Sequence, residues 1–245
     1  MTEYNYHDFL ALMGVGGAHP GGLSFTKHLL KNVQIDQNSR VLDAGCGTGQ
    51  TAAYIAETYG CHVTAIDRHP VMIEKAKQRF EANNIKVDLI QGNIEQMPFV
   101  DASFDFILIE SVTVFTNIDQ TISEYTRTLR QGGVLMDLEM TAIPPLTQAM
   151  KKAFEQLYGI QHIPSEKEWQ NKYEQAGLHS FEMINGNSVE ESLHKHHSQT
   201  DNEEAPEFSV SPTIDPTIHQ IWDEHQLLTE TYADKLNYRV YRMKK

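Results

Sequence analysis

Ten consecutive residues carry the strongest structural signal in this chain of 245: Val41-Leu42-Asp43-Ala44-Gly45-Cys46-Gly47-Thr48-Gly49-Gln50. A short apolar run is followed at once by glycines at alternate positions, and residues 51–59 then show a helical pattern with small alanines suited to close packing. Glycine in such a turn lets a ligand approach the main chain without meeting a Cβ atom, and the first turn of the helix presents free N–H groups with a partial positive charge. The order of strand, turn and helix therefore predicts a ligand site at the carboxyl end of a strand.

The same alternation of apolar and amphipathic runs continues from Arg40 to about Met140. A β-branched run at 62–67 ends on an acid, and Pro70 then opens a helix with Met72, Ala76 and Phe80 on one face. Further strands are predicted at 86–91, 104–109 and 134–140, a helix at 118–129 and a turn at 131–133. Strands and helices alternating at this pitch predict a parallel sheet with helices on both faces.

The two ends of the chain depart from this pattern. Before Arg40, five glycines crowd around His19-Pro20 and precede a predicted helix at 23–33. After Met140, helices are predicted at 146–158 and 165–176, and strands at 178–184 and 236–243. We therefore predict an N-terminal lid and helix at 1–39, and one α/β domain at 40–245 with an insertion at about 186–235.

The insertion is strongly acidic. Residues 188–234 hold 11 Asp and Glu against one Lys, a net charge of −10 within the −13 of the whole chain. Its first half is polar and is predicted to be loop, whereas 216–234 has helical spacing that suggests a helix laid on the body of the protein. The acidic surface favours either a cationic substrate or solubility, and the overall charge disfavours nucleic acid and anionic membranes as partners.

The compartment is predicted from the cysteines and the start of the chain. Two cysteines, Cys46 and Cys61, do not make a disulfide framework, and the polar, acidic start lacks the layout of a secretory signal. No apolar stretch approaches the roughly 20 residues that span a bilayer. A reduced cytoplasm is the expected location.

The cofactor class depends on two positions. Asp67 lies 22 residues after Gly45, at the end of the next strand, where a carboxylate can accept hydrogen bonds from a ribose diol. Nicotinamide and flavin enzymes favour G-x-G-x-x-G, which would need glycine where this chain has Gln50. A nicotinamide-dependent oxidoreductase is therefore the weaker alternative.

Five ordered segments resemble the class I S-adenosylmethionine-dependent methyltransferases. The segment 41–50 resembles motif I of that family, and Asp67 resembles its ribose-binding acid. Residues 91–99 resemble its adenine-binding segment, with Asn93 where Asp is more usual, and 101–105 and 129–133 resemble the segments before its fourth and fifth strands. The similarity is closest to the small-molecule branch, which includes quinone and sterol methyltransferases. It implies a Rossmann-like, doubly wound, seven-stranded sheet, mostly parallel with the last strand antiparallel.

The resemblance also implies that S-adenosylmethionine binds and that S-adenosylhomocysteine is the product. The implied cofactor-binding residues are Asp43, Gly45, Cys46, Gly47, Gly49, Asp67, Arg68, Met72, Gly92, Asn93, Ile94 and Glu110. In the alternative reading the glycines only pack the helix on the strand, and Arg68 and Met72 are ordinary surface and core. Cys46 is expected to pack as a small residue and not to act as a nucleophile.

Methyl transfer from a sulfonium is an in-line displacement, so alignment of donor and acceptor is the main task of the protein. A base is needed only if the acceptor must lose a proton. The candidates are Glu110 and Glu139, at the ends of the predicted fourth and fifth strands, and His19, if its glycine-rich segment folds over the cofactor. Glu110 has the alternative of binding the cofactor's ammonium group or a backbone amide, and the His19 segment has the alternative of being a plain connector.

The histidine-rich run His194-Lys195-His196-His197 matches no zinc pattern, so no metal is predicted. The sequence therefore predicts a cytoplasmic methyltransferase that acts on a small molecule, and it is silent on oligomeric state. A protein that binds S-adenosylmethionine without turnover is the alternative from another functional class.

Overall fold

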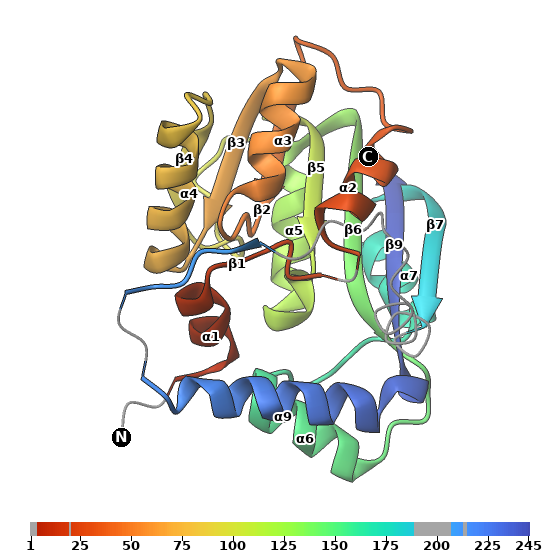
Figure 1. The fold of residues 1–245 in the computed structure, drawn as a ribbon. Coiled ribbons are helices and arrows are strands. Elements are labelled where there is room, and N and C mark those ends of the chain that lie inside the picture. Colours follow the sequence, from red (N-terminus) through yellow and green to blue (C-terminus); the bar gives the residue numbers. More distant parts are fainter. Residues whose placement is uncertain (1–3, 20, 189–206, 213–214) are drawn as a thin grey trace.

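The computed structural model describes residues 4–19, 21–188, 207–212 and 215–245. Figure 1 shows a central twisted sheet with helices on both faces and a further layer of helices below it. In chain order the elements are α1 (Tyr6–Met13), β1 (Val15–Gly16), α2 (Gly22–Leu30), β2 (Arg40–Ala44), α3 (Gln50–Tyr59), β3 (His62–Asp67), α4 (Pro70–Ala82), β4 (Asp88–Gln91), β5 (Phe104–Glu110), η1 (Thr113–Phe115), α5 (Ile118–Thr128), β6 (Leu129–Ala142), α6 (Gln148–Tyr158), α7 (Glu166–Gln175), β7 (His179–Ser188), β8 (Glu207–Phe208), α9 (Ile218–Thr231), η2 (Ala233–Lys235) and β9 (Leu236–Lys244).

The main sheet has seven strands in the order β4-β3-β2-β5-β6-β9-β7. Neighbours from β4 to β6 pair in parallel, whereas β9 pairs antiparallel with both β6 and β7. The predicted doubly wound, mostly parallel sheet with an antiparallel last strand is therefore confirmed. The chain winds outward from β2 to β4 and then returns to β5, so the order reverses between β2 and β5, which is the usual ligand-binding position in such sheets.

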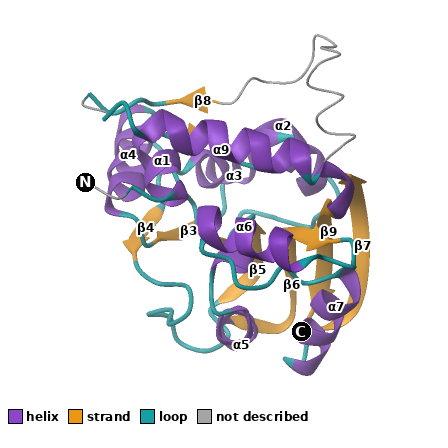
Figure 2. Ribbon diagram, turned by 90° about the horizontal axis from the view of Figure 1, so that it is seen from below, coloured by secondary structure: helices purple, strands orange, loops and turns teal. Residues whose placement is uncertain are grey.

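Two apolar cores lie on the two faces of the sheet. On one face, α2, α3 and α4 pack on alternate strand residues such as Val41 and Phe106. On the other face, α5 and α7 cover Leu42 and Ile107. The aromatic rings of α7 are buried in this same core. Figure 2, seen from below, shows α6 and α9 lying across the end of the sheet with α1 beside them. This layer of helices covers the end where the parallel strands finish.

Strand β6 begins earlier than the sequence predicted. Residues 131–133 were expected to form a turn before a strand at 134, but the strand already starts at Leu129. Leu129 pairs with Phe104 and Val134 pairs with Phe106, so the intervening residues bulge out of the ladder. Gly132, at φ +76°, takes the left-handed conformation that the bulge requires.

Two elements near the N-terminus were not predicted. Helix α1 is fixed by a capping box, in which the Asn5 side chain accepts from the backbone of Asp8 and the Asp8 side chain accepts from the backbone of Asn5. Strand β1 pairs antiparallel with β8, which brings the middle of the acidic insertion back to the N-terminal segment. The predicted helix in the second half of that insertion is confirmed as α9, and its Trp222 ring stacks on Phe9 at 5.5 Å between centroids.

Some sequence predictions lie outside the described residues. These are the histidine-rich run at 194–197, most of the predicted loop at 192–216 and Pro20. Within the described ranges, no helix is long and apolar enough to cross a membrane. Cys46 and Cys61 are both buried free thiols.

Candidate functional site

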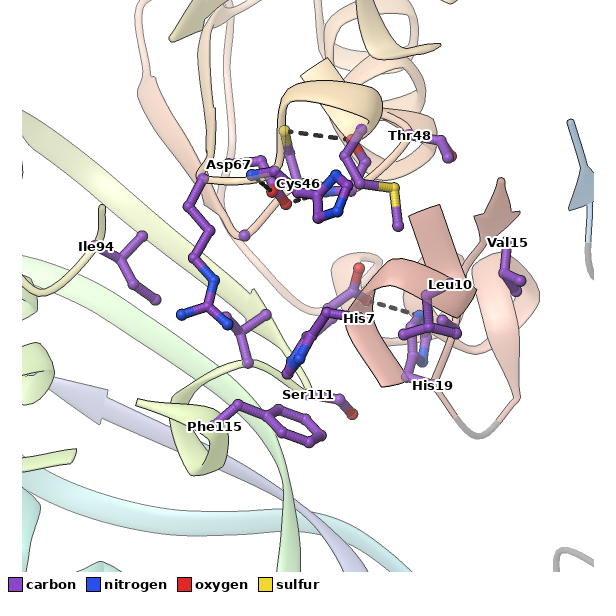
Figure 3. A pocket seen from close by; sticks show the side chains of 18 of the residues that line it. His7, Leu10, Val15, His19, Cys46, Thr48, Asp67, Ile94, Ser111 and Phe115 are labelled. Carbon is purple, nitrogen blue, oxygen red and sulfur yellow. Dashed lines mark hydrogen bonds and ion pairs between the residues drawn. The ribbon is translucent and has the colours of Figure 1, made fainter. Parts of the chain in front are cut away.

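A cavity opens where the sheet order reverses, at the carboxyl ends of β2, β3 and β5. The glycine turn after β2, Asp67 at the end of β3 and Glu110 at the end of β5 line one half of it. Figure 3 shows His7, Leu10 and His19 of the N-terminal segment lying opposite the turn that carries Cys46. The cavity is therefore built by the strand ends and closed by the segment that precedes them.

The three glycines of the turn have different surroundings. All have positive φ, at +80°, +51° and +73° for Gly45, Gly47 and Gly49. A Cβ atom on Gly45 would lie 2.5 Å from Val112, and one on Gly49 would lie 2.6 Å from Phe80. A Cβ atom on Gly47 would meet only the Met72 sulfur, at 3.9 Å. Gly49 therefore lets α3 pack closely on α4, and not on the strand as the alternative reading had it, whereas Gly47 leaves room for a ligand beside the main chain.

Asp67 ties the turn to the neighbouring strand. Its carboxylate accepts hydrogen bonds from the Gly47 amide at 2.9 Å and the His69 amide at 2.8 Å. Burial raises the pKa of Asp67, and these two amide bonds oppose that rise. A carboxylate has about four lone-pair positions, so Asp67 keeps acceptor capacity for ligand hydroxyls.

Asp43 is a buried carboxylate with an unused oxygen. It is 3% exposed and lines the cavity, and its Oδ2 has no hydrogen-bond partner among the described residues. Burial raises the pKa of Asp43 well above its ordinary value, and the nearby charge of Glu110 adds to the rise. Because buried polar atoms are nearly always paired, this oxygen marks a place where a ligand cation or hydroxyl would be held.

Glu110 gathers three elements around its carboxylate. It accepts hydrogen bonds from the Thr26 hydroxyl and, at 2.7 Å, from the Thr51 hydroxyl. His19 Nε2 lies 3.3 Å from Glu110 Oε1 (Figure 3). Glu110 thus joins α2, α3 and the N-terminal segment at the floor of the cavity.

The cavity lining includes every predicted site residue except Gly49 and Glu139. Glu139 is fully buried, and its Oε1 accepts from the amides of Val112 and Thr113 at 2.8 and 2.6 Å. This position argues against the predicted role of Glu139 as a base. Successive strand residues alternate between faces, and on β6 it is Met140 that reaches the cavity.

The adenine side of the predicted site has the expected composition. Met72 and Ile94 are buried apolar residues in the lining, beside Arg68 and Gly92. The Asn93 side chain forms a local turn, since its Oδ1 accepts from the Glu95 amide at 3.0 Å and its Nδ2 donates to the Glu95 carboxylate at 3.2 Å. One N–H of the Asn93 Nδ2 is used in this turn, which leaves its second N–H for a ligand.

The other half of the cavity was not predicted from the sequence. It is lined by rings from five separate elements: Tyr6, Phe115, Tyr158, His225 and Tyr238. These rings are far apart in sequence and follow no motif. One feature of the sequence could have indicated this half of the cavity. His225 is a polar residue on the otherwise apolar face of the predicted helix at 216–234.

The described residues offer no group of three or more His, Cys, Asp or Glu that could hold a metal ion. They do offer buried polar atoms without partners in the cavity lining: Asp43 Oδ2, Thr48 Oγ1 and Ser111 Oγ. Together with the open space at Gly47, these atoms fit a ligand that combines hydroxyls with a cationic group, as S-adenosylmethionine does.

Comparison with known proteins points the same way. A family model described as a methyltransferase domain matches residues 41–133. The uncharacterized methyltransferase YodH of Bacillus subtilis (strain 168) is 33% identical over 96% of this chain and 97% of its own length. The demethylmenaquinone methyltransferase of Listeria welshimeri is 30% identical over 54% of this chain and 58% of its own length.

A solved structure shares the whole fold. The phosphoethanolamine N-methyltransferase 2 of Haemonchus contortus, in complex with S-adenosyl-L-methionine, superposes with a TM-score of 0.76 at 17% sequence identity. The superposition covers 100% of this chain but 58% of that one, so this chain corresponds to a little over half of the larger protein.

Proposed function

Because the chain belongs to the class I S-adenosylmethionine-dependent methyltransferases, we propose that it transfers a methyl group from S-adenosylmethionine to a small-molecule acceptor. The single observation that carries the proposal is the buried, unpartnered oxygen of Asp43 beside the open backbone at Gly47. Dinucleotide-binding turns place a third glycine where Gln50 stands in this chain.

The residues that hold the cofactor divide by chemistry. Asp67 would accept hydrogen bonds from the ribose hydroxyls, and Asp43 would face the cationic methionine end. Met72 and Ile94 would pack on the adenine ring. When bound, the cofactor supplies a methyl group on a sulfonium, whose leaving sulfur becomes neutral.

The protein aligns the reactants and excludes water. His19 is 8% exposed and, with Glu110, links the N-terminal segment to the cavity floor. If the acceptor must lose a proton, His19 and Glu110 are the predicted base candidates that line the cavity, whereas Glu139 is not. We also propose a reducing compartment such as the cytoplasm, where the buried thiols of Cys46 and Cys61 stay free.

Calorimetric titration tests the proposal directly. The purified protein should bind S-adenosylmethionine and S-adenosylhomocysteine, and it should not bind NADH. Formation of S-adenosylhomocysteine across a panel of small-molecule acceptors then measures turnover. Binding without turnover on any acceptor would favour the non-catalytic alternative, and tighter binding of NADH would contradict the assignment.

Asp67→Ala should weaken binding of S-adenosylmethionine by about 1–3 kcal/mol, the scale for losing hydrogen bonds to a charged group. Asp67→Asn is the companion variant, because it keeps the shape of the side chain and removes its charge. Asp88→Ala, an exposed carboxylate at the start of β4, is the matched control and should leave the affinity unchanged. Equal affinities in all three variants would remove Asp67 from the site.

A further inference from the structure

The chemistry of the acceptor can be read from the half of the cavity that the cofactor motifs leave unused. This inference rests on the proposed methyl transfer. The strands that bear the motifs, β2 and β3, lie on one side of β5, whereas β6 and β9, which carry Met140 and Tyr238, lie on the other. Met140 and Tyr238 are direct cross-strand neighbours. An acceptor entering beside the cofactor therefore meets the ring-lined half.

The rings of this half hold one another in place. The Tyr6 ring lies edge-on to Tyr158 at 4.8 Å and stacks on His225 at 5.1 Å and on Phe115 at 6.3 Å, measured between centroids. The Tyr158 hydroxyl and His225 Nδ1 are 2.7 Å apart, within hydrogen-bond distance. Both faces of Tyr6 are thus covered by other rings. An ammonium group needs open ring faces around it, and this arrangement does not provide them at Tyr6.

The ring-lined half also carries no formal charge at neutral pH. Burial lowers the pKa of His225 to about 4, and burial followed by the charge of Arg68 lowers the pKa of His7 to about 4. Burial raises the pKa of Tyr158 to about 12. Each of these side chains is therefore neutral. An ion moved among these neutral side chains loses hydration and gains no counter-charge from them.

The charged lining residues belong to the cofactor half. They are Asp43, Asp67, Arg68 and Glu110. The carboxylates of Asp67 and Glu110 already accept two hydrogen bonds each. Arg68 directly follows Asp67 at the end of β3, and its charge acts on His7, so Arg68 is the counter-charge that an anionic acceptor would use.

From the ring lining and its neutral side chains, we propose that the acceptor is an uncharged, flat, largely apolar molecule held against Phe115 and Tyr158. All five rings lie outside the five motifs, and two of them, Tyr158 and His225, come from α6 and α9. His225 lies on α9, in the second half of the acidic insertion, so this segment contributes to acceptor selection.

Three probes of one shape and different charge test the proposal: naphthol, naphthoate and protonated naphthylmethylamine. Each is titrated into the full-length protein saturated with S-adenosylhomocysteine, and binding is followed by calorimetry. We expect naphthol to bind at least about tenfold more tightly than either ion, because only the ions lose strong hydration.

Variants show whether the probe uses the ring-lined half. Phe115→Ala and Tyr158→Ala should each lower the affinity for naphthol about tenfold while leaving that for S-adenosylhomocysteine within about twofold. Tyr158→Phe keeps the ring and should retain naphthol binding, so it serves where Tyr158→Ala fails to fold. Tyr54→Ala, at a half-buried ring on α3 outside the cavity lining, is the control.

The outcomes separate the two claims. If naphthoate or the amine binds as tightly as naphthol, or if naphthol does not bind, the proposed acceptor class is wrong although the cofactor still binds. Tighter binding of naphthoate that is lost in Arg68→Gln would instead indicate an anionic acceptor. If S-adenosylhomocysteine itself does not bind, the proposed function fails first.

Discussion

Gly47 and Gly60 share a backbone conformation but differ in what surrounds them. Their φ values are +51° and +61°, both in the left-handed region. A Cβ atom on Gly60 would meet nothing within 4 Å, and one on Gly47 would meet only the Met72 sulfur. Gly60 ends α3 outside the cavity lining, whereas Gly47 faces the cavity. The pair therefore separates backbone strain from ligand contact.

Gly47→Ala should lower the affinity for S-adenosylmethionine by about tenfold or more, because the new methyl group occupies the space through which the ligand approaches the main chain. Both Gly47→Ala and Gly60→Ala should lower the free energy of unfolding by about 1–2 kcal/mol, the cost of a side chain in the left-handed region. Calorimetric binding and chemical denaturation measure the two effects. Equal loss of affinity in both variants would mean that strain, and not contact, is responsible.

The residues that the sequence predicted best are those whose roles depend on local geometry. Asp43, Gly47 and Asp67 follow directly from strand ends and a glycine turn, so their positions are set within a few residues of chain. Tyr158 and His225 come together only because α6 and α9 pack across the sheet, and no local pattern specifies that packing. Glu139 was misplaced because the predicted strand end did not determine which face its side chain would take.

At the level of elements, the short pair β1–β8 fastens the N-terminal segment over the glycine turn. Val15, which lines the cavity, pairs with Phe208. The Glu207 carboxylate lies 2.9 Å from Arg79 Nη2 on α4 and accepts from Gln50 Nε2 at 3.0 Å. Gln50, which stands where dinucleotide-binding proteins have glycine, thus helps to anchor this cover.

Glu207→Ala should increase the dissociation rate of S-adenosylmethionine by up to about fivefold, because a partly exposed ion pair contributes about 0.2–1 kcal/mol. Stopped-flow displacement by S-adenosylhomocysteine measures the rate. Glu81→Ala breaks the exposed pair with Lys77 on the same helix, α4, and is the matched control. Identical rates in wild type and Glu207→Ala would show that β1–β8 does not restrain the ligand.

The longer elements were predictable because each repeats its own period many times. Helices α3, α4, α5 and α7 and the strands of the sheet lie within a few residues of the predicted ranges. Strands β1 and β8 have two residues each and carry no periodic signal. Helix α1 begins close to the chain start, where its polar capping residues resemble loop. Short elements held by tertiary contacts are those that local patterns miss.

On the scale of the whole molecule, a buried acidic pair on strand β6 braces the acceptor half. Asp137 accepts from the Thr113 hydroxyl at 2.9 Å and the Tyr173 hydroxyl at 2.7 Å, and Glu139 holds the amides at the start of η1. Thr113 opens η1, which carries Phe115 in the cavity lining. Burial raises the pKa of both carboxyl groups, so the folded protein favours a proton on this pair.

This proton makes stability depend on pH. Above the ordinary aspartate pKa, near 4, the unfolded chain has lost the proton that the folded chain keeps. The stabilisation is therefore fully present below about pH 4 and is lost as the pH rises through the raised folded pKa, with a slope of at most about 1.4 kcal/mol per pH unit for one proton. Groups whose pKa is lowered by hydrogen bonds, such as Glu124 beside Arg127, make the free energy of unfolding rise with pH. A variant of the buried pair is therefore needed to isolate its own contribution to the pH dependence.

Asp137→Asn removes one titrating group from the pair and keeps acceptor capacity toward Thr113 and Tyr173. Its free energy of unfolding should fall less steeply between pH 5 and pH 8 than that of the wild type, because one fewer folded-state proton remains to be lost. Urea denaturation at several pH values measures both slopes. Asp119→Asn, an exposed carboxylate paired with Lys172, should keep the wild-type slope. If Asp137→Asn keeps it as well, Asp137 is not the group that loses a proton in this pH range, and the brace beneath η1 does not depend on its titration.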